Sequence, residues 1–139
     1  MSGDVFVDTN VLVYAYDADA GVRHEQAKEL LARLWQAKPL PWISVQVLQE
    51  LLVTLRRKGV ASSEARETVE DQMRWRVVEN SVGVFKAAMS EMERWQLSLW
   101  DGLILASARS VGVSTVYSED LSDEQDYGGI HIVNPFRMP

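Results

Sequence analysis

Short apolar segments rich in β-branched residues alternate along this chain with longer segments of helical periodicity. We expect strands at residues 5–7, 42–43, 76–78, 115–117 and 130–133. We expect helices after Thr9, over 22–36, from a cap at Ser44 to Gly59, over about 63–73, up to about Trp95, and from about Asp101 to Gly112. Parallel strands need long crossover connections, which are usually helices, so this alternation favours a mainly parallel sheet. The predicted fold class is α/β, a three-layer α/β/α sandwich.

The length of the chain, 139 residues with 47% hydrophobic composition, is that of one globular domain. We see no internal repeat, low-complexity tract or linker, and therefore expect a single domain over residues 1–139. The longest uninterrupted apolar stretch, Val11 to Tyr16, is far shorter than the ~20 residues that cross a bilayer. We expect a cytoplasmic protein without a membrane segment.

Charge and cysteine content limit the partners and the metal chemistry. The chain has no cysteine, so a bound metal must use oxygen or imidazole ligands, and only His24 and His131 supply imidazole. A net charge of −6 argues against a protein that binds nucleic acid by general positive charge. It does not exclude a nuclease, because part of the negative charge can sit in one carboxylate cluster that bound cations neutralise.

Two sets of side chains are candidates for contact with nucleic acid, and each also has an ordinary structural interpretation. Six of the 14 basic residues can line a groove or form ordinary solvated helix surface: Arg56, Arg57, Lys58, Arg66, Arg74 and Arg76. The five tryptophans can stack on RNA or contact a partner, but buried packing is the more common role: Trp35, Trp42, Trp75, Trp95 and Trp100.

Four acidic residues lie at the ends of expected strands or in expected helices. Asp8 follows the first strand and Asp120 follows the strand at 115–117. Asp101 lies in the first turn of its helix, and Glu50 lies at the border of the apolar stripe of another. Ligands of parallel α/β sheets bind beyond the carboxyl ends of the strands. The fold would therefore bring these four distant residues together.

Each of the four acids also has an ordinary structural interpretation. Asp8 can cap the helix that follows it, and Asp101 can interact favourably with its helix dipole. A glutamate at the position of Glu50 most often faces solvent, and Asp120 can belong to a polar loop. Only the set of four together favours a functional site.

A cluster of carboxylates has a definite chemical consequence. Two unit charges about 4 Å apart repel by several kcal/mol at an effective dielectric near 20, so a cluster must take up protons, separate or bind a cation. Oxygen ligands suit Mg²⁺ or Mn²⁺, and Mg²⁺ usually binds a few carboxylates together with substrate phosphate. Such a cation activates water and stabilises the leaving oxygen. The predicted reaction is phosphodiester hydrolysis by a metal-dependent nuclease.

Several motifs in this order resemble the PIN-domain family, and particularly the VapC-like toxins of bacterial toxin–antitoxin systems. The resemblance covers nearly the whole chain, and no single motif is specific without the others. The matching segments are Val7–Leu12, Glu50–Leu51, Trp100–Ala108, Tyr117–Leu121 and the closing Gly129–Phe136.

The resemblance implies an endoribonuclease that uses Mg²⁺ or Mn²⁺, forms a homodimer and is inhibited by a small antitoxin protein. Asp8, Glu50, Asp101 and Asp120 would be the catalytic, metal-binding set. Asn10 and Ser118 would position a ligand or water, and Glu119 would be a possible additional carboxylate beside Asp120. Gly102 stands where the family often has Ala, which should not disturb the site.

Functions of other classes fit the sequence less well. A haloacid-dehalogenase-like phosphatase has a second Asp two positions after the first, and this chain has Asn10 there. A phosphoryl-accepting receiver domain would need an acidic pair at its first strand, where Asp8 stands alone. A non-catalytic RNA-binding or protein-interaction module on the same fold remains the alternative, and it would retain RNA without cleaving it.

Overall fold

The computed structural model describes residues 4–137. Its strands are β1 (Phe6–Val7), β2 (Trp42–Ser44), β3 (Arg76–Val78), β4 (Thr115–Tyr117), β5 (Asp126–Tyr127) and β6 (Ile130–Val133). Its helices are α1 (Thr9–Tyr16), α2 (Val22–Trp35), α3 (Val45–Arg57), α4 (Ser62–Gln72), α5 (Val82–Trp95) and α6 (Leu99–Ser110), with a short 3₁₀ helix at Ala18–Ala20. No helix within residues 4–137 is long and apolar enough to cross a membrane.

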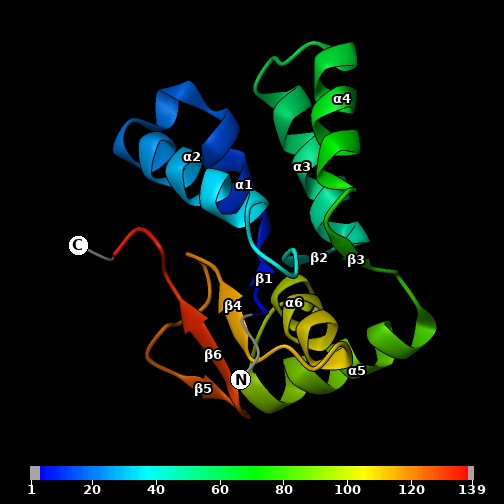
Figure 1. Cartoon of the computed structure of the whole chain (residues 1–139). Coiled ribbons are helices and arrows are strands. Elements are labelled where there is room, and N and C mark those ends of the chain that lie inside the picture. The colour runs from blue at the N-terminus through cyan, green and yellow to red at the C-terminus, as the bar shows by residue number, and fades with distance from the viewer. Residues whose placement is uncertain (1–3, 138–139) are drawn as a thin grey trace.

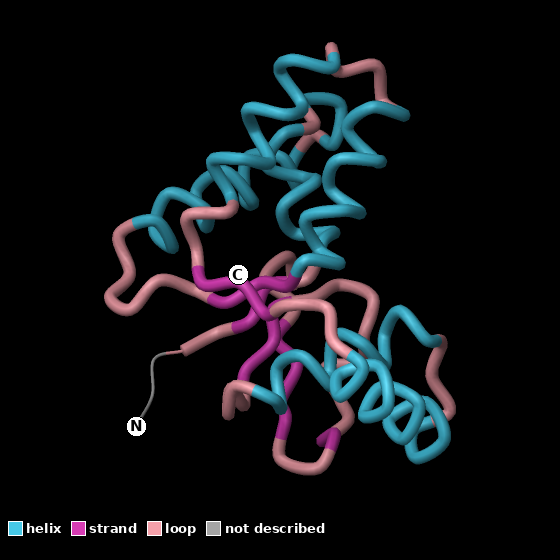
Figure 2. The backbone as a smooth tube through the Cα atoms, turned by 90° about the vertical axis from the view of Figure 1, so that its right-hand side faces the viewer, coloured by secondary structure: helices cyan, strands magenta, loops and turns pink. Residues whose placement is uncertain are grey.

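The strands form one sheet in the order β3-β2-β1-β4-β6-β5. All neighbouring pairs are parallel except β5 and β6. Helices α1 to α4 lie on one side of the sheet and α5 and α6 on the other, as the two views show (Figures 1 and 2). The predicted α/β class with a mainly parallel central sheet is confirmed.

The strand order creates a crevice at the centre of the sheet. The chain runs outward from β1 to β2 and β3, then returns to place β4 on the other side of β1. The backbone N–H of Asp8, just after β1, donates to the carbonyl of Tyr117, the last residue of β4, at 2.9 Å. Ligands of open α/β sheets bind at such a switch point, beyond the carboxyl ends of the strands. Asp8 and Asp120 lie there.

Helix α3 shows how the sequence positions one wall of this crevice. The hydroxyl of Ser44 accepts from the backbone N–H of Val47 at 3.2 Å, so the predicted cap is confirmed. Leu51 and Leu55 of the apolar stripe are almost completely buried in the core. Since one face of α3 packs against the core in this way, the adjoining face that carries Glu50 lies at the edge of the crevice.

Gly102 explains how closely α6 packs against α5. A Cβ atom at Gly102 would lie 2.8 Å from the carbonyl oxygen of Ala88 and 3.1 Å from Cγ of Met92. The backbone oxygen cannot move without disturbing α5. From the sequence, Gly102 was interpreted as a minor departure from a family pattern. In the structure its lack of a side chain lets α6 pack closely against α5.

Replacing Gly102 with Ala is expected to destabilise the protein by about 1–2 kcal/mol. Overpacking typically costs 1–3 kcal/mol, which outweighs the gain of up to about 1 kcal/mol from replacing a helical glycine. Urea unfolding measures the difference. The matched control is Gly83→Ala in α5, where a Cβ would meet only the Ser81 hydroxyl at 3.8 Å. If Gly102→Ala proved as stable as Gly83→Ala, the close packing of α6 against α5 at Gly102 would be contradicted.

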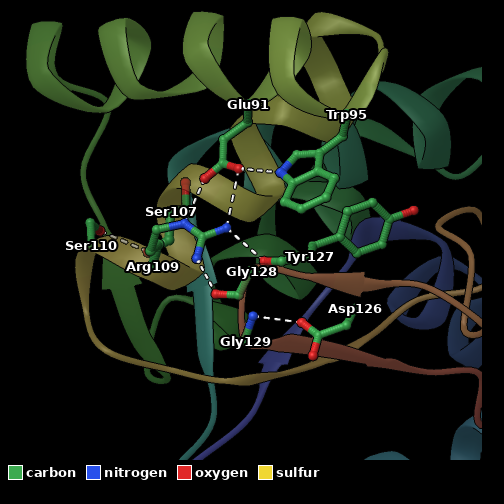
Figure 3. Close-up of polar contacts among 9 residues, drawn as sticks. All are labelled: Glu91, Trp95, Ser107, Arg109, Ser110, Asp126, Tyr127, Gly128 and Gly129. Atoms are coloured by element: carbon green, nitrogen blue, oxygen red, sulfur yellow. Dashed lines mark hydrogen bonds and ion pairs between the residues drawn. The ribbon is translucent and has the colours of Figure 1, made fainter.

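An ion pair between the buried carboxylate of Glu91 and the partly exposed guanidinium of Arg109 ties α5 and α6 to the β5–β6 turn (Figure 3). The carboxylate of Glu91, whose side chain is 8% exposed, accepts from Arg109 Nε at 2.6 Å and from Trp95 Nε1 at 2.8 Å. Arg109 also donates to the carbonyls of Tyr127 at 2.8 Å and Gly128 at 3.0 Å. One guanidinium therefore neutralises a buried charge and fixes the turn.

Arg109→Ala is expected to lower the free energy of unfolding by about 3 kcal/mol, because it leaves the Glu91 carboxylate buried without its counter-charge. The same unfolding experiment on Arg66→Ala provides the control. Arg66 forms an exposed pair with Glu70 on α4, and such pairs contribute about 0.3–0.5 kcal/mol. Equal losses in the two variants would contradict a structural role for the Glu91–Arg109 pair.

Candidate active site

All four acidic residues predicted from the sequence line one pocket beyond the carboxyl ends of β1 and β4. The pocket has a volume of about 290 Å³. Its lining residues are Asp8, Thr9, Asn10, Gln46, Glu50, Ser98, Trp100, Asp101, Ile104 and Asp120. No Lys, Arg or His is among these lining residues, so the four carboxylates share the pocket without a basic partner among the residues that line it.

Asp8 is the most deeply buried acid of the pocket, with an exposed fraction of 6%. Its carboxylate caps α1 by accepting from the backbone N–H of Thr9 at 2.7 Å. Burial raises the pKa of Asp8 from 3.8 to about 7 against the lowering effect of its hydrogen bonds, and the charges of Asp120 and Glu50 raise it further. The capping prediction is confirmed, and the same carboxylate also lines the pocket.

Ser118 orients the Asp8 carboxylate through a hydrogen bond. The Ser118 hydroxyl oxygen accepts from the backbone N–H groups of Asp120 at 3.1 Å and Leu121 at 3.3 Å. Its single proton is therefore directed to Asp8 Oδ2, 2.8 Å away. Ser118 is fully buried and does not line the pocket, so it contacts Asp8 and the backbone that follows β4.

Asn10 connects the two strand ends. Its amide nitrogen lies 3.4 Å from Asp8 Oδ2, and its amide oxygen accepts from the backbone N–H of Glu119 at 3.2 Å. Asn10 also lines the pocket. Its side chain thus links the loop after β4 to the carboxylate after β1.

Glu50 is oriented by two residues that the sequence did not single out. The Thr9 hydroxyl and the Gln46 amide nitrogen each donate to Glu50 Oε1 at 3.0 Å. Gln46 lies four residues before Glu50 on α3, a spacing at which helical side chains meet. That spacing was a usable signal, whereas the approach of Thr9 depends on how α1 packs against α3.

Asp101 is half-buried in the first turn of α6, where Ser98 caps the helix by accepting from the Asp101 backbone N–H at 3.2 Å. Burial raises the pKa of Asp101, and the negative charges of Asp120 and Glu50 raise it further. Asp120 and Glu50 thus act electrostatically on both Asp8 and Asp101.

Glu119 points away from this set. Its carboxylate accepts from the Tyr14 hydroxyl at 2.7 Å and from Arg23 Nε at 2.6 Å. Burial would raise the pKa of Glu119, but these hydrogen bonds outweigh burial and lower it. Glu119 does not line the pocket, so the structure separates it from its neighbour Asp120.

The donor set fits a hard divalent cation. As they stand, no three Asp, Glu or His residues within residues 4–137 are grouped closely enough to hold a metal ion. Burial is the main cause of the raised pKa values of Asp8 and Asp101, and the charges of Asp120 and Glu50 add to it, so a bound cation would relieve both the desolvation and the repulsion. Gln46 Oε1 is buried without a hydrogen-bond partner, and a water of a hydrated cation would supply a donor.

Comparison with known protein families gives one match. The PIN domain model matches residues 5–122, which include all four pocket acids. No curated protein sequence matches this chain.

Solved structures with similar folds include proteins of toxin–antitoxin systems. A toxin–antitoxin complex from Klebsiella pneumoniae is 21% identical and has a TM-score of 0.69, with 96% of this chain and 99% of that chain covered. DNA-bound VapBC from Salmonella typhimurium is 20% identical and has a TM-score of 0.69, with 95% and 98% covered. VapC20 from Mycobacterium tuberculosis, a toxin that cleaves the sarcin–ricin loop, is 24% identical and has a TM-score of 0.68, with 84% and 89% covered. At these identities the similarity is one of fold.

Proposed function

The chain belongs to the PIN-domain family, and we propose that it is a metal-dependent endoribonuclease, the toxin of a toxin–antitoxin pair, that hydrolyses RNA phosphodiester bonds in the cytoplasm. The observation that carries the proposal is the single pocket lined by Asp8, Glu50, Asp101 and Asp120, with no basic side chain among its lining residues. Carboxylates gathered without counter-charges favour a divalent cation, and a cation in such a site favours phosphate.

In this proposal the four carboxylates hold Mg²⁺ or Mn²⁺, which supplies a polarised phosphoryl oxygen and a more acidic water. Ser118 and Asn10 keep the Asp8 carboxylate in place through their contacts with Oδ2. Thr9 and Gln46 keep Glu50 in place through Oε1. Because these hydrogen bonds already hold the carboxylates in place, the site needs little reorganisation when substrate binds. Such preorganisation is how polar groups contribute to catalysis.

An antitoxin and a second copy of the chain are the proposed protein partners. The similar structures include a toxin–antitoxin complex and a VapBC assembly. A chain with a net charge of −6 and an acidic pocket suits an inhibitor with a positively charged segment. Lack of affinity for the product of a neighbouring small reading frame would count against this pairing.

A non-catalytic RNA-binding or protein-interaction module remains the second candidate. One observation favours it, since no three acids of the described chain are grouped closely enough for a metal ion as they stand. Such a module would bind RNA with or without Mg²⁺ and leave it uncleaved.

The test is RNA cleavage by partner-free, metal-stripped protein with and without added Mg²⁺ or Mn²⁺. Discrete fragments that need the metal, and that Asp101→Asn does not produce, would support the proposal and exclude a contaminating nuclease. RNA that is retained but not cut under any metal condition would favour the binding module.

A further inference from the structure

Trp100 is the exception among the tryptophans of this chain. Its exposed fraction is 58%, whereas Trp75 is 3% exposed. Trp35, Trp42 and Trp95 pack against the hydrophobic core, so the sequence interpretation of buried packing holds for these four. Trp100 instead precedes Asp101 and lines the acidic pocket. A large aromatic surface is therefore left in solvent at the edge of the candidate active site.

A second hollow of about 330 Å³ continues the acidic pocket along α3. It shares Gln46, Glu50 and Trp100 with that pocket, and its other lining residues include Val53, Thr54 and Arg57. The α3 residues of this groove lie at helical intervals of three or four, so they belong to one face of the helix. We call this hollow the α3–Trp100 groove.

Arg57 lies at the end of the α3–Trp100 groove farther from the acidic pocket. It is exposed and makes no hydrogen bond or ion pair through its side chain within residues 4–137. The other five basic residues of the set singled out in the sequence have such partners or stack on Trp35. Arg57 lies seven positions after Glu50, or roughly 10 Å along the helix axis. The groove thus runs from carboxylates, past an exposed indole, to a free guanidinium.

We propose that the α3–Trp100 groove binds the nucleotide next to the cleaved bond in a single-stranded stretch of RNA. The base stacks on the Trp100 indole, and the phosphate beyond it pairs with Arg57. This proposal rests on the proposed ribonuclease function and deepens it. Stacking on an aromatic side chain requires a base that is free of its own strand partners. Unpaired regions are therefore the substrates, and fully duplex RNA is excluded.

Cleavage kinetics test the contribution of the indole. Trp100→Ala is expected to raise KM about 5- to 150-fold, the loss associated with one stacked base, and to change KM more than kcat. Trp100→Phe should recover part of this loss because it keeps an aromatic face. Met73→Ala, which truncates another exposed apolar side chain at the end of α4, should leave KM unchanged. An unchanged KM in Trp100→Ala, with cleavage intact, would overturn the groove and leave the ribonuclease proposal standing.

Binding without cleavage separates the two proposals. In an Asp8→Asn background, single-stranded oligouridylate should quench tryptophan fluorescence, and Trp100→Phe in that background should abolish the quenching. Duplex RNA of the same length should not quench. Arg57→Gln should reduce the salt dependence of binding by about 0.7 in log–log slope, the value for one single-strand phosphate contact. Quenching that persists in Trp100→Phe would overturn the groove. Absence of metal-dependent cleavage in the unaltered protein would overturn the ribonuclease function and the position next to a cleaved bond, and Trp100-dependent quenching would then support only RNA binding in the groove.

Discussion

Replacing Asp8 with Asn is expected to lower the rate of metal-dependent RNA cleavage by roughly a hundredfold or more, the scale for removing one preorganised charged or polar group from an active site. Asn keeps the size of Asp but removes a negative charge from the deepest position of the pocket. It also cannot accept both hydrogen bonds, because the Thr9 N–H and the Ser118 hydroxyl donate to different oxygens of Asp8. Single-turnover cleavage at saturating Mn²⁺ measures the loss.

The matched control for this variant is Glu67→Gln. Glu67 is an exposed acid of α4 that does not line the pocket, so its substitution makes the same change of net charge elsewhere. It should cleave RNA at the unaltered rate. Full activity in Asp8→Asn would remove Asp8 from the mechanism, and equal losses in both variants would point to net charge rather than to the pocket.

The contribution of Asp8 to the stability of the metal-free protein is expected to fall as pH rises from about 4 to about 7. The folded protein holds the proton of Asp8 up to its raised pKa of about 7, whereas the unfolded chain releases it near the ordinary value of 3.8. Between these values the unfolded state binds fewer protons, so deprotonation favours unfolding. The difference between the two pKa values corresponds to roughly 4 kcal/mol, with the full stability present below pH 4.

Urea unfolding with a chelator, at several pH values from 4 to 8, isolates this contribution when the protein is compared with Asp8→Asn. The variant should gain relative stability by roughly 4 kcal/mol across the range, because Asn does not titrate. The raised pKa of Asp101 acts in the same direction, but Asp101 is present in both proteins and its contribution cancels. A stability difference that stays constant with pH would contradict the burial of an uncompensated carboxyl group at Asp8.

Local sequence patterns predicted much of the fold and most of the choice of pocket residues. The alternation of strands and helices predicted the parallel sheet, and the position of Asp8 after a strand predicted both a cap and a place at the sheet edge. Glu50, whose position on α3 alone is typical of a solvent-facing residue, was predicted at the site only as a member of the set of four, and it lines the pocket. These predictions succeeded because they depend on periodicity and on where strands end, which a sequence displays directly.

Features that depend on contacts between distant segments were not predictable in this way. Strand β5 has two residues and forms only because the Gly128–Gly129 turn, with φ of +63° and +94°, folds it back on β6. The side chain of Glu119 turns to Tyr14 and Arg23, although its sequence position matches that of a pocket residue. The packing role of Gly102 requires the position of α5, which no local pattern specifies.

The central claim, that the pocket carboxylates together hold a divalent cation, is tested most directly by titrating Mn²⁺ into metal-stripped protein and measuring free Mn²⁺ by electron paramagnetic resonance. The account predicts saturable binding that Asp101→Asn weakens at least about tenfold and that Glu67→Gln leaves unchanged. Equal affinity in all three proteins, or no binding by the unaltered protein, would contradict it.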